Sequence, residues 1–149
     1  YVMHGAADLG VVGLDVLEEK EYDLIKLLDL KLGRCKVAFG LRAGEKLNFD
    51  KSKITIATKH EKIAKKYFEQ KAMAVEIIKL YGSIELAPLV GLCDCIVDIV
   101  ETGETMKQNG LEVGPTIIYI TAHLIANKNS FYAKKDLIFD LKDKLEKFL

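Results

Sequence analysis

The sequence predicts an α/β protein with two lobes, in which mixed sheets carry helices on both faces. Short apolar, β-branched runs alternate with segments of helical periodicity, a pattern typical of this fold class. The chain is expected to cross between lobes near Leu30 and again near Pro115. We therefore expect residues 1–29 and 116–149 to form a first, incomplete lobe and residues 30–115 to form an inserted second lobe.

The first half of the chain supplies most of the expected elements. Helices are predicted over residues 14–20 and 60–71, the second with an apolar stripe facing the sheet, Thr58 as its cap and an exposed His60 in its first turn. Strands are predicted where short apolar runs are bounded by turn residues, over 7–12, 24–30, 35–41, 54–57 and 75–80.

The last third is predicted to begin with a connector over residues 111–115. A strand returning to the first lobe is expected within 116–127. Residues 130–149 change to helical spacing, with Leu137, Leu141 and Leu145 on one stripe, which predicts a terminal amphipathic helix.

The segment 97–105 carries the main candidate site. The buried strand 95–97 leads into it, Thr102 and Gly103 form a tight turn, and a short helix follows that ends at Gly110. Where a helix begins after a glycine turn, unpaired backbone N–H groups and the helix dipole attract anions. The hydroxyls of Thr102 and Thr105 add donors, and Gly103 permits close approach of a phosphate.

Two acidic residues lie beside this turn. Asp98 and Glu101 would repel a phosphate unless they bind the hydroxyls of an attached sugar or a magnesium ion that bridges to phosphate oxygens. Together with the turn they predict a site for a phosphorylated sugar. The alternative is a plain turn in which Thr105 caps the helix and the two acids form a solvated rim.

Charge and composition exclude several classes of partner. Twenty-two basic residues balance 22 acidic ones, so there is no electrostatic reason to expect nucleic acid or an anionic membrane. No apolar run approaches the about 18 residues of a transmembrane helix, and no secretion signal is present, which favours a cytoplasmic protein. Cys93 and Cys95 lack the second ligand pair of a zinc site and are interpreted as small apolar side chains.

Four blocks of sequence resemble one known family in the same order. Residues 80–92 (LYGSIELAPLVGL) and 98–111 (DIVETGETMKQNGL) look like ATP phosphoribosyltransferase, the first enzyme of histidine biosynthesis. Upstream, residues 4–13 (HGAADLGVVG) and 56–59 (IATK) are similar to the same family. The resemblance covers nearly the whole chain and favours the functional interpretation of the segment 97–105.

The resemblance implies a fold similar to periplasmic binding proteins, with the phosphoribosyl site in the inserted lobe. It implies that N1 of ATP displaces pyrophosphate from phosphoribosyl pyrophosphate with Mg2+ and without a protein nucleophile. Asp98 and Glu101 would hold the ribose hydroxyls or the metal. The remaining expected residues bind the 5-phosphate or line the substrate cleft: Thr102, Gly103, Glu104 and Thr105 at the phosphate, and Gly13, Asp15, Gly82 and Ser83 in the cleft. Plain structural roles remain open for the cleft residues, with Ser83 as an ordinary helix cap and Gly13 and Asp15 in an ordinary turn before a helix.

The resemblance also bears on assembly. The chain stops after its terminal helix, as in the short form of the family, which self-associates and joins a regulatory subunit resembling histidyl-tRNA synthetase in a hetero-octamer. The stripe of Leu137, Leu141 and Leu145 either serves that contact or packs on its own lobe. The family's N-terminal segment has no counterpart here, so the chain is interpreted as a fragment or as numbered from after a lost portion, which leaves its independent activity open. The alternative function is a non-catalytic two-lobed solute-binding module.

Overall fold

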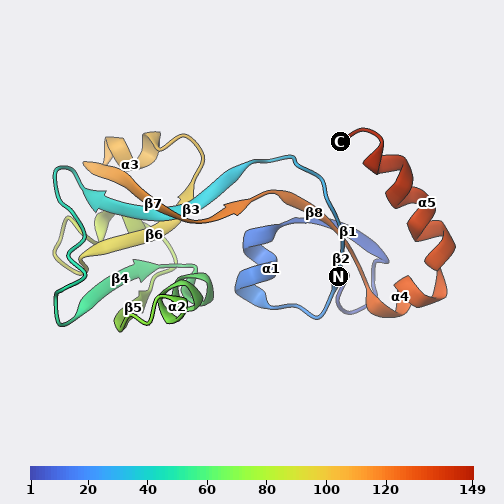
Figure 1. The fold of residues 1–149 in the computed structure, drawn as a ribbon, viewed down its shortest axis with the longest axis horizontal. Coiled ribbons are helices and arrows are strands. Elements are labelled where there is room, and N and C mark those ends of the chain that lie inside the picture. The colour runs from blue at the N-terminus through green and yellow to red at the C-terminus, as the bar shows by residue number, and fades with distance from the viewer. The chain divides into compact units, whose positions relative to one another are not determined.

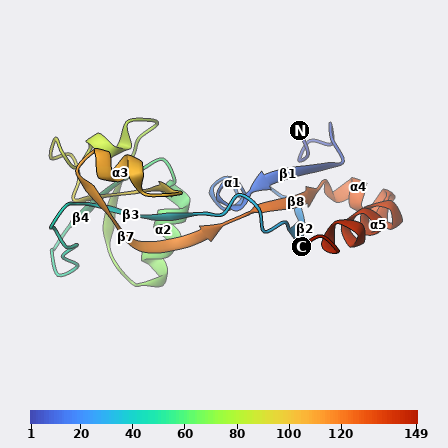
Figure 2. The same cartoon turned by 90° about the horizontal axis from the view of Figure 1, so that it is seen from above.

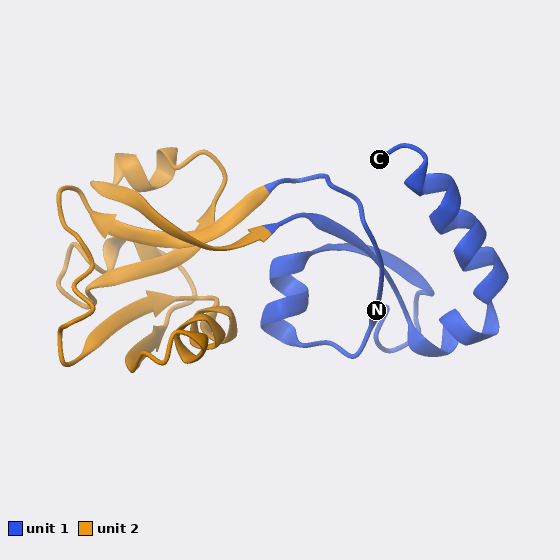
Figure 3. Cartoon of the chain, viewed as in Figure 1, with its two compact units in different colours: residues 1–34, 120–149 blue, residues 35–119 orange.

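The computed structural model describes residues 1–149, which divide into two compact units. Unit 1 comprises Tyr1–Arg34 and Ile120–Leu149, and unit 2 comprises Cys35–Tyr119 (Figure 3). The expected lobe limits at residues 30 and 115 lie slightly before these boundaries. Residues just after 29 stay with unit 1 because Leu30 N–H donates to Ala122 O and Ala122 N–H donates to Leu32 O, both at 2.9 Å. No helix is long and apolar enough to cross a bilayer.

Unit 1 is built on a three-stranded antiparallel sheet of order β1-β8-β2 (Figure 1). Its helix α1 follows β1 directly, over the residues expected. The sequence predicts one terminal helix, but the chain forms two, because it turns at Lys134. The elements are β1 (Leu9–Gly13), α1 (Leu14–Lys20), β2 (Ile25–Asp29), β8 (Ala122–Ala126), α4 (Lys128–Ala133) and α5 (Lys135–Glu146).

Helix α5 packs on the rest of unit 1 through Ile138 rather than through the predicted leucine stripe, for which a partner contact is the other interpretation. Ile138 is buried, whereas Leu137 is 71% exposed and Leu141 is also exposed. The stripe of Leu137, Leu141 and Leu145 is therefore not the main packed face of α5. Ile138 is offset from that stripe by one residue, or about 100° around the helix.

Unit 2 contains a five-stranded sheet of order β5-β4-β6-β3-β7. β4 runs parallel to both β5 and β6, and β3 runs antiparallel to β6. The connector predicted at 111–115 is wrong, because β7 begins at Leu111, a buried residue, and pairs with β3. Pro115 is tolerated there because β7 is an edge strand. The strands are β3 (Cys35–Arg42), β4 (Ile54–Thr58), β5 (Val75–Lys79), β6 (Cys95–Val100) and β7 (Leu111–Ile120).

Helical segments cover both faces of this sheet. The ring of Phe39 lies 5.7 Å from the rings of both Tyr67 and Phe68, which belong to α2 (Glu61–Gln70). The preceding residue of β3, Ala38, belongs instead to a buried cluster with residues of η1 (Ile84–Leu86) and α3 (Glu104–Gln108). Because successive side chains of a strand point to opposite faces, α2 covers one face and η1 and α3 cover the other (Figure 2). The α/β class with helices on both faces is confirmed in unit 2.

Candidate functional site

The carboxyl ends of three parallel strands form one edge of the unit 2 sheet. Thr58, the last residue of β4, is paired with Lys79 at the end of β5 and with Val97 of β6. The segments that follow these strands, 59–60, 80–83 and 101–105, therefore emerge at the same edge. The chain places β5 on one side of β4 and then crosses to β6 on the other side. Such a reversal of strand order is where open α/β sheets bind ligands.

The turn after β6 leaves backbone donors available. Gly103 has φ +82°, and an added Cβ would lie 3.0 Å from Val113 Cγ2, so glycine is favoured there on both counts. Glu104 N–H donates to Thr102 Oγ1 at 3.3 Å, and Lys107 N–H donates to Gly103 O at 3.0 Å. The N–H groups of Gly103, Thr105 and Met106 have no acceptor within the chain.

The alternative in which Thr105 caps α3 does not hold. Gly103 is the N-cap, and Thr105 is the second residue of the helix, with an exposed side chain. The side chains of Glu101, Thr102 and Glu104 are exposed as well. The turn thus presents three unpaired amides together with two threonine hydroxyls.

Asp98 lies on β6 within reach of two groups from the end of β4. Its Oδ1 is 3.9 Å from Lys59 Nζ and 3.7 Å from His60 Nε2, and it accepts a 2.8 Å hydrogen bond from Ile99 N–H. The Asp98 side chain is 24% exposed, so it keeps access to a ligand from solvent. A lysine ammonium beside this carboxylate balances its negative charge at the edge of a site proposed for phosphate.

The prediction that His60 is exposed is wrong, because the residue is buried. His60, and not Thr58, is the N-cap residue of α2. Thr58 is fully buried and donates its hydroxyl to Val97 O at 2.6 Å, while its Oγ1 accepts from His60 N–H at 2.9 Å. Through these two hydrogen bonds Thr58 joins the start of α2 to β6. His60 is therefore held close to the strand that carries Asp98.

The segment after β5 differs from its prediction. Ser83 has φ +50° and makes no side-chain hydrogen bond to the helix start, so it is not an ordinary cap. The helix that follows is a short 3₁₀ turn. Gly82 is exposed, and an added Cβ would meet nothing within 4 Å. Sterics alone therefore do not require glycine at this position.

Tyr81 directly precedes Gly82 and Ser83 in the chain. The sequence did not predict Tyr81, Lys59 or His60 as site residues. The side chain of Tyr81 is 87% exposed, and Lys79 Nζ lies 5.7 Å from the centroid of its ring. The signal that could have found all three residues is their position directly after strands of a parallel sheet.

Two of the expected cleft residues belong to the other unit. Gly13 is the N-cap of α1, with extended backbone angles, and a Cβ there would lie 2.3 Å from Asp15 Oδ1. The Asp15 carboxylate therefore folds back over Gly13 at the start of α1. All other candidate residues lie in unit 2.

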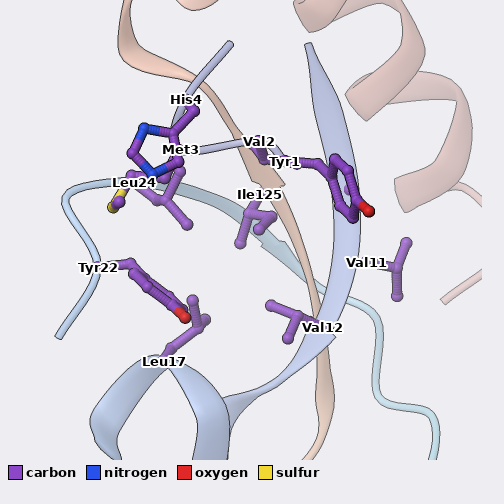
Figure 4. A pocket seen from close by; sticks show the side chains of 11 residues that line it. Tyr1, Val2, Met3, His4, Val11, Val12, Leu17, Tyr22, Leu24 and Ile125 are labelled. Carbon is purple, nitrogen blue, oxygen red and sulfur yellow. The ribbon is translucent and has the colours of Figure 1, made fainter. Parts of the chain in front are cut away.

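Unit 1 also contains a pocket of about 280 Å³ beside β1 (Figure 4). Its lining is mainly apolar and aromatic, with no carboxylate or lysine among its residues. It offers no anion-binding donors like those of the turn after β6. The lining residues are Tyr1, Val2, Met3, His4, Gly10, Val11, Val12, Leu17, Tyr22, Leu24 and Ile125.

Cys93 and Cys95 are both buried, and Cys95 is inaccessible to solvent. Burial raises the pKa of the Cys95 thiol from 9.0 to about 12, and it also raises the pKa of Cys93. Both side chains therefore stay protonated near neutral pH and pack as small apolar groups.

Comparison with known proteins identifies the family of this chain. The sequence profile described as HisG, ATP phosphoribosyltransferase, matches residues 1–147. A relative named ATP phosphoribosyltransferase from Sulfurovum sp. is 62% identical over 146 residues, covering 98% of this chain and 71% of the relative. One of the same name from Nitratiruptor sp. is 60% identical over 149 residues, covering 100% of this chain and 73% of the relative.

Solved structures give the same result. The ATP phosphoribosyl transferase (HisG:HisZ) complex from Thermotoga maritima matches with a TM-score of 0.84 and 37% identity, over 99% of this chain and 72% of that chain. The arginine-bound, truncated ArgBP from T. maritima matches with a TM-score of 0.62 at 10% identity, over 99% of this chain and 71% of that chain, which shows a shared fold alone. On the profile match and the high identities, the chain belongs to the ATP phosphoribosyltransferase family.

Proposed function

We propose that the turn after β6 binds the 5-phosphate of phosphoribosyl pyrophosphate, whose phosphoribosyl group is then transferred to N1 of ATP in the first step of histidine biosynthesis. The observation that carries this site is the set of unpaired N–H groups of Gly103, Thr105 and Met106. The backbone of Glu104 completes the turn, and the hydroxyls of Thr102 and Thr105 add two donors. A dianionic phosphate accepts from such groups through its peripheral oxygens.

Asp98 and Glu101 would then bind the ribose hydroxyls. A carboxylate is a strong acceptor for a hydroxyl donor, and both residues lie on the chain just before the phosphate turn. Lys59 stands 3.9 Å from Asp98, and its positive charge offsets repulsion between this carboxylate and the phosphates.

The same two carboxylates suit a magnesium ion. No cluster of three or more His, Cys, Asp or Glu side chains forms a closed metal cage in this structure. Magnesium usually keeps several waters and binds one or two carboxylates plus substrate phosphates, so the donor set of Asp98 and Glu101 fits it. When bound, the ion would neutralise negative charge on the pyrophosphate group.

The transfer requires no protein nucleophile, because N1 of the adenine ring itself attacks C1 of the ribose while pyrophosphate departs with the bonding electrons. The residues of this chain would act by holding the two substrates in line and by stabilising charge. Gly82 and Ser83 are proposed for the ATP or pyrophosphate side, and Gly13 and Asp15 for the contribution of unit 1 to substrate binding.

We further propose that the chain works in the cytoplasm, associates with itself, and joins a regulatory subunit in a hetero-octamer. The similarity to a protein solved as a HisG:HisZ complex supports a partner of the HisZ kind. The exposed residues Leu137 and Leu141 of α5 are available for such a contact. A solute-binding module without catalysis is the weaker alternative, since ArgBP and a periplasmic binding protein match only at the level of the fold.

Calorimetric titration with phosphoribosyl pyrophosphate, with and without Mg2+, tests the site. We expect saturable, magnesium-dependent binding that weakens by about 1–3 kcal/mol in Thr105→Ala and in Asp98→Asn, the scale of lost hydrogen bonds to charged groups. Unchanged affinity in both variants would overturn the assignment.

Matched controls exist at the opposite end of the same strands. Ser52→Ala removes an exposed hydroxyl just before β4, and Asp94→Asn removes a lysine-paired carboxylate just before β6. Both controls should bind phosphoribosyl pyrophosphate as the unmodified chain does. Equal weakening in controls and site variants would indicate a general loss of structure.

A further inference from the structure

We propose that Tyr81 is a specificity-determining residue that stacks on the adenine ring of ATP. This inference rests on the proposed function, because it names the residue that receives the second substrate. The sheet edge that carries the phosphate turn also carries this large, exposed aromatic side chain, two residues after the end of β5.

The ring of Tyr81 is supported on the protein side. Lys79 Nζ lies 5.7 Å from the ring centroid, within the range of a cation–π contact. The same Nζ lies 3.8 Å from Glu61 Oε2 at the start of α2, which restrains the lysine. The side chain nevertheless remains 87% exposed, so a flat ligand can cover it.

The spacing of the strands suits the two substrates. β5 and β6 flank β4, and neighbouring strands lie about 4.8 Å apart, so the strand that precedes Tyr81 lies about 10 Å across the sheet from the strand that leads into the phosphate turn. That separation is comparable to the span from a 5-phosphate across ribose to a base attached at C1. Lys59, at the end of β4, lies between them, where the ribose and the departing pyrophosphate would be.

Stacking also suits the chemistry of the attack. A tyrosine ring binds the face of a purine and leaves its edge free, so N1 can approach C1 without losing a hydrogen bond to the protein. Stacking of a base on an aromatic side chain contributes enough affinity to be measured by alanine substitution. A purine presents a larger face than a pyrimidine, so the same contact favours ATP over CTP or UTP.

Steady-state kinetics of Tyr81→Ala and Tyr81→Phe test the role. We expect the KM for ATP to rise at least tenfold in Tyr81→Ala and to change less than twofold in Tyr81→Phe, because the ring and not the hydroxyl makes the contact. The KM for phosphoribosyl pyrophosphate should change less than twofold in both. Tyr119→Ala is the matched control, since Tyr119 is 75% exposed in the same unit but lies on β7. An unchanged KM for ATP in Tyr81→Ala would overturn the proposal.

A direct binding measurement decides the inference even if turnover is absent. The chain contains no tryptophan, so Tyr81→Trp introduces a single indole fluorophore. We expect ATP to change its emission saturably and CTP to do so at least fivefold more weakly, because stacking alters the environment of the indole. No response to ATP would contradict the stacking role. A response to ATP without binding of phosphoribosyl pyrophosphate would instead contradict the proposed phosphate site.

Discussion

The two units bury apolar side chains in different ways. In unit 2, the interior strand β3 has four consecutive buried residues, and Val37, Ala38 and Phe39 are inaccessible to solvent. In unit 1, the edge strand β1 has no fully buried residue, and its Val11 is 62% exposed. A sheet covered on both faces is stabilised by packing on each side. The stability of a three-stranded sheet with exposed edge strands depends on fewer packing contacts. The proposed phosphate turn is attached to the unit with the larger core.

The largest expected effect is on the core of unit 2. Phe39→Ala should lower the free energy of unfolding by about 3–5 kcal/mol, because it removes a buried ring packed against α2. Val11→Ala, the counterpart on β1, should cost less than about 0.5 kcal/mol because its side chain is largely exposed. Urea unfolding followed by circular dichroism measures both. Similar values for the two variants would remove the contrast between the units.

A smaller effect is expected where Thr58 joins β4, α2 and β6. Thr58→Val keeps the shape of the side chain but leaves Val97 O and His60 N–H without their hydroxyl partner, so we expect a loss of about 1–3 kcal/mol in unfolding free energy. Thr116→Val on β7, whose side chain makes no hydrogen bond, is the control. If the two variants are equally stable, the hydroxyl of Thr58 contributes nothing to the unfolding free energy.

Asp94 gives a pH-dependent test at the other end of β6. Hydrogen bonds from Lys51 Nζ at 2.6 Å and from Thr55 N–H at 2.8 Å hold the pKa of this carboxyl below its usual value of 3.8. A lowered folded-state pKa stabilises the protein above about pH 4, and this contribution is lost as the pH falls through the folded value. Asp94→Asn should therefore cost about 1 kcal/mol at pH 7.

The difference between Asp94→Asn and the unmodified chain should shrink progressively in unfolding experiments below pH 4. A difference that stays constant down to pH 2 would mean that the charge of Asp94 is not the cause. In unit 1, Asp8 also has a lowered pKa, from hydrogen bonds with Lys134 and Ser130, but it is solvent-exposed. Asp8→Asn is expected to have the smaller effect.

The smallest effect concerns thiol reactivity, which reports local opening of unit 2. Cys95 should resist a thiol reagent at pH 8 until the protein unfolds, because its pKa is raised to about 12 and its side chain is buried. Cys35 is only partly buried and should react faster. Labelling followed by peptide mass spectrometry distinguishes the positions. Rapid labelling of Cys95 in the folded protein would show that the core of unit 2 opens easily.

Local patterns predicted several elements closely. The helix over 14–20 was located to the residue, and the strand and helix around β4 and α2 within one or two residues, because their apolar periodicities and flanking polar residues are unambiguous. The composition of the segment 97–105 and the family resemblance both predict a candidate site there. The failures share a cause: β7, His60 and Tyr81 acquire their environments from partners distant in the chain, which local patterns do not contain.

The sequence by itself determined the α/β class, the family, and the turn of Thr102, Gly103 and Thr105, because glycine, hydroxyl and apolar positions act through the local backbone. Only the tertiary structure decided that the ends of β4, β5 and β6 lie at one edge. That edge brings Lys59 and His60 to Asp98 and places Tyr81 two strands from the phosphate turn. Strand order depends on pairings between segments about 20 to 40 residues apart, and their free energy exists only once the sheet has formed.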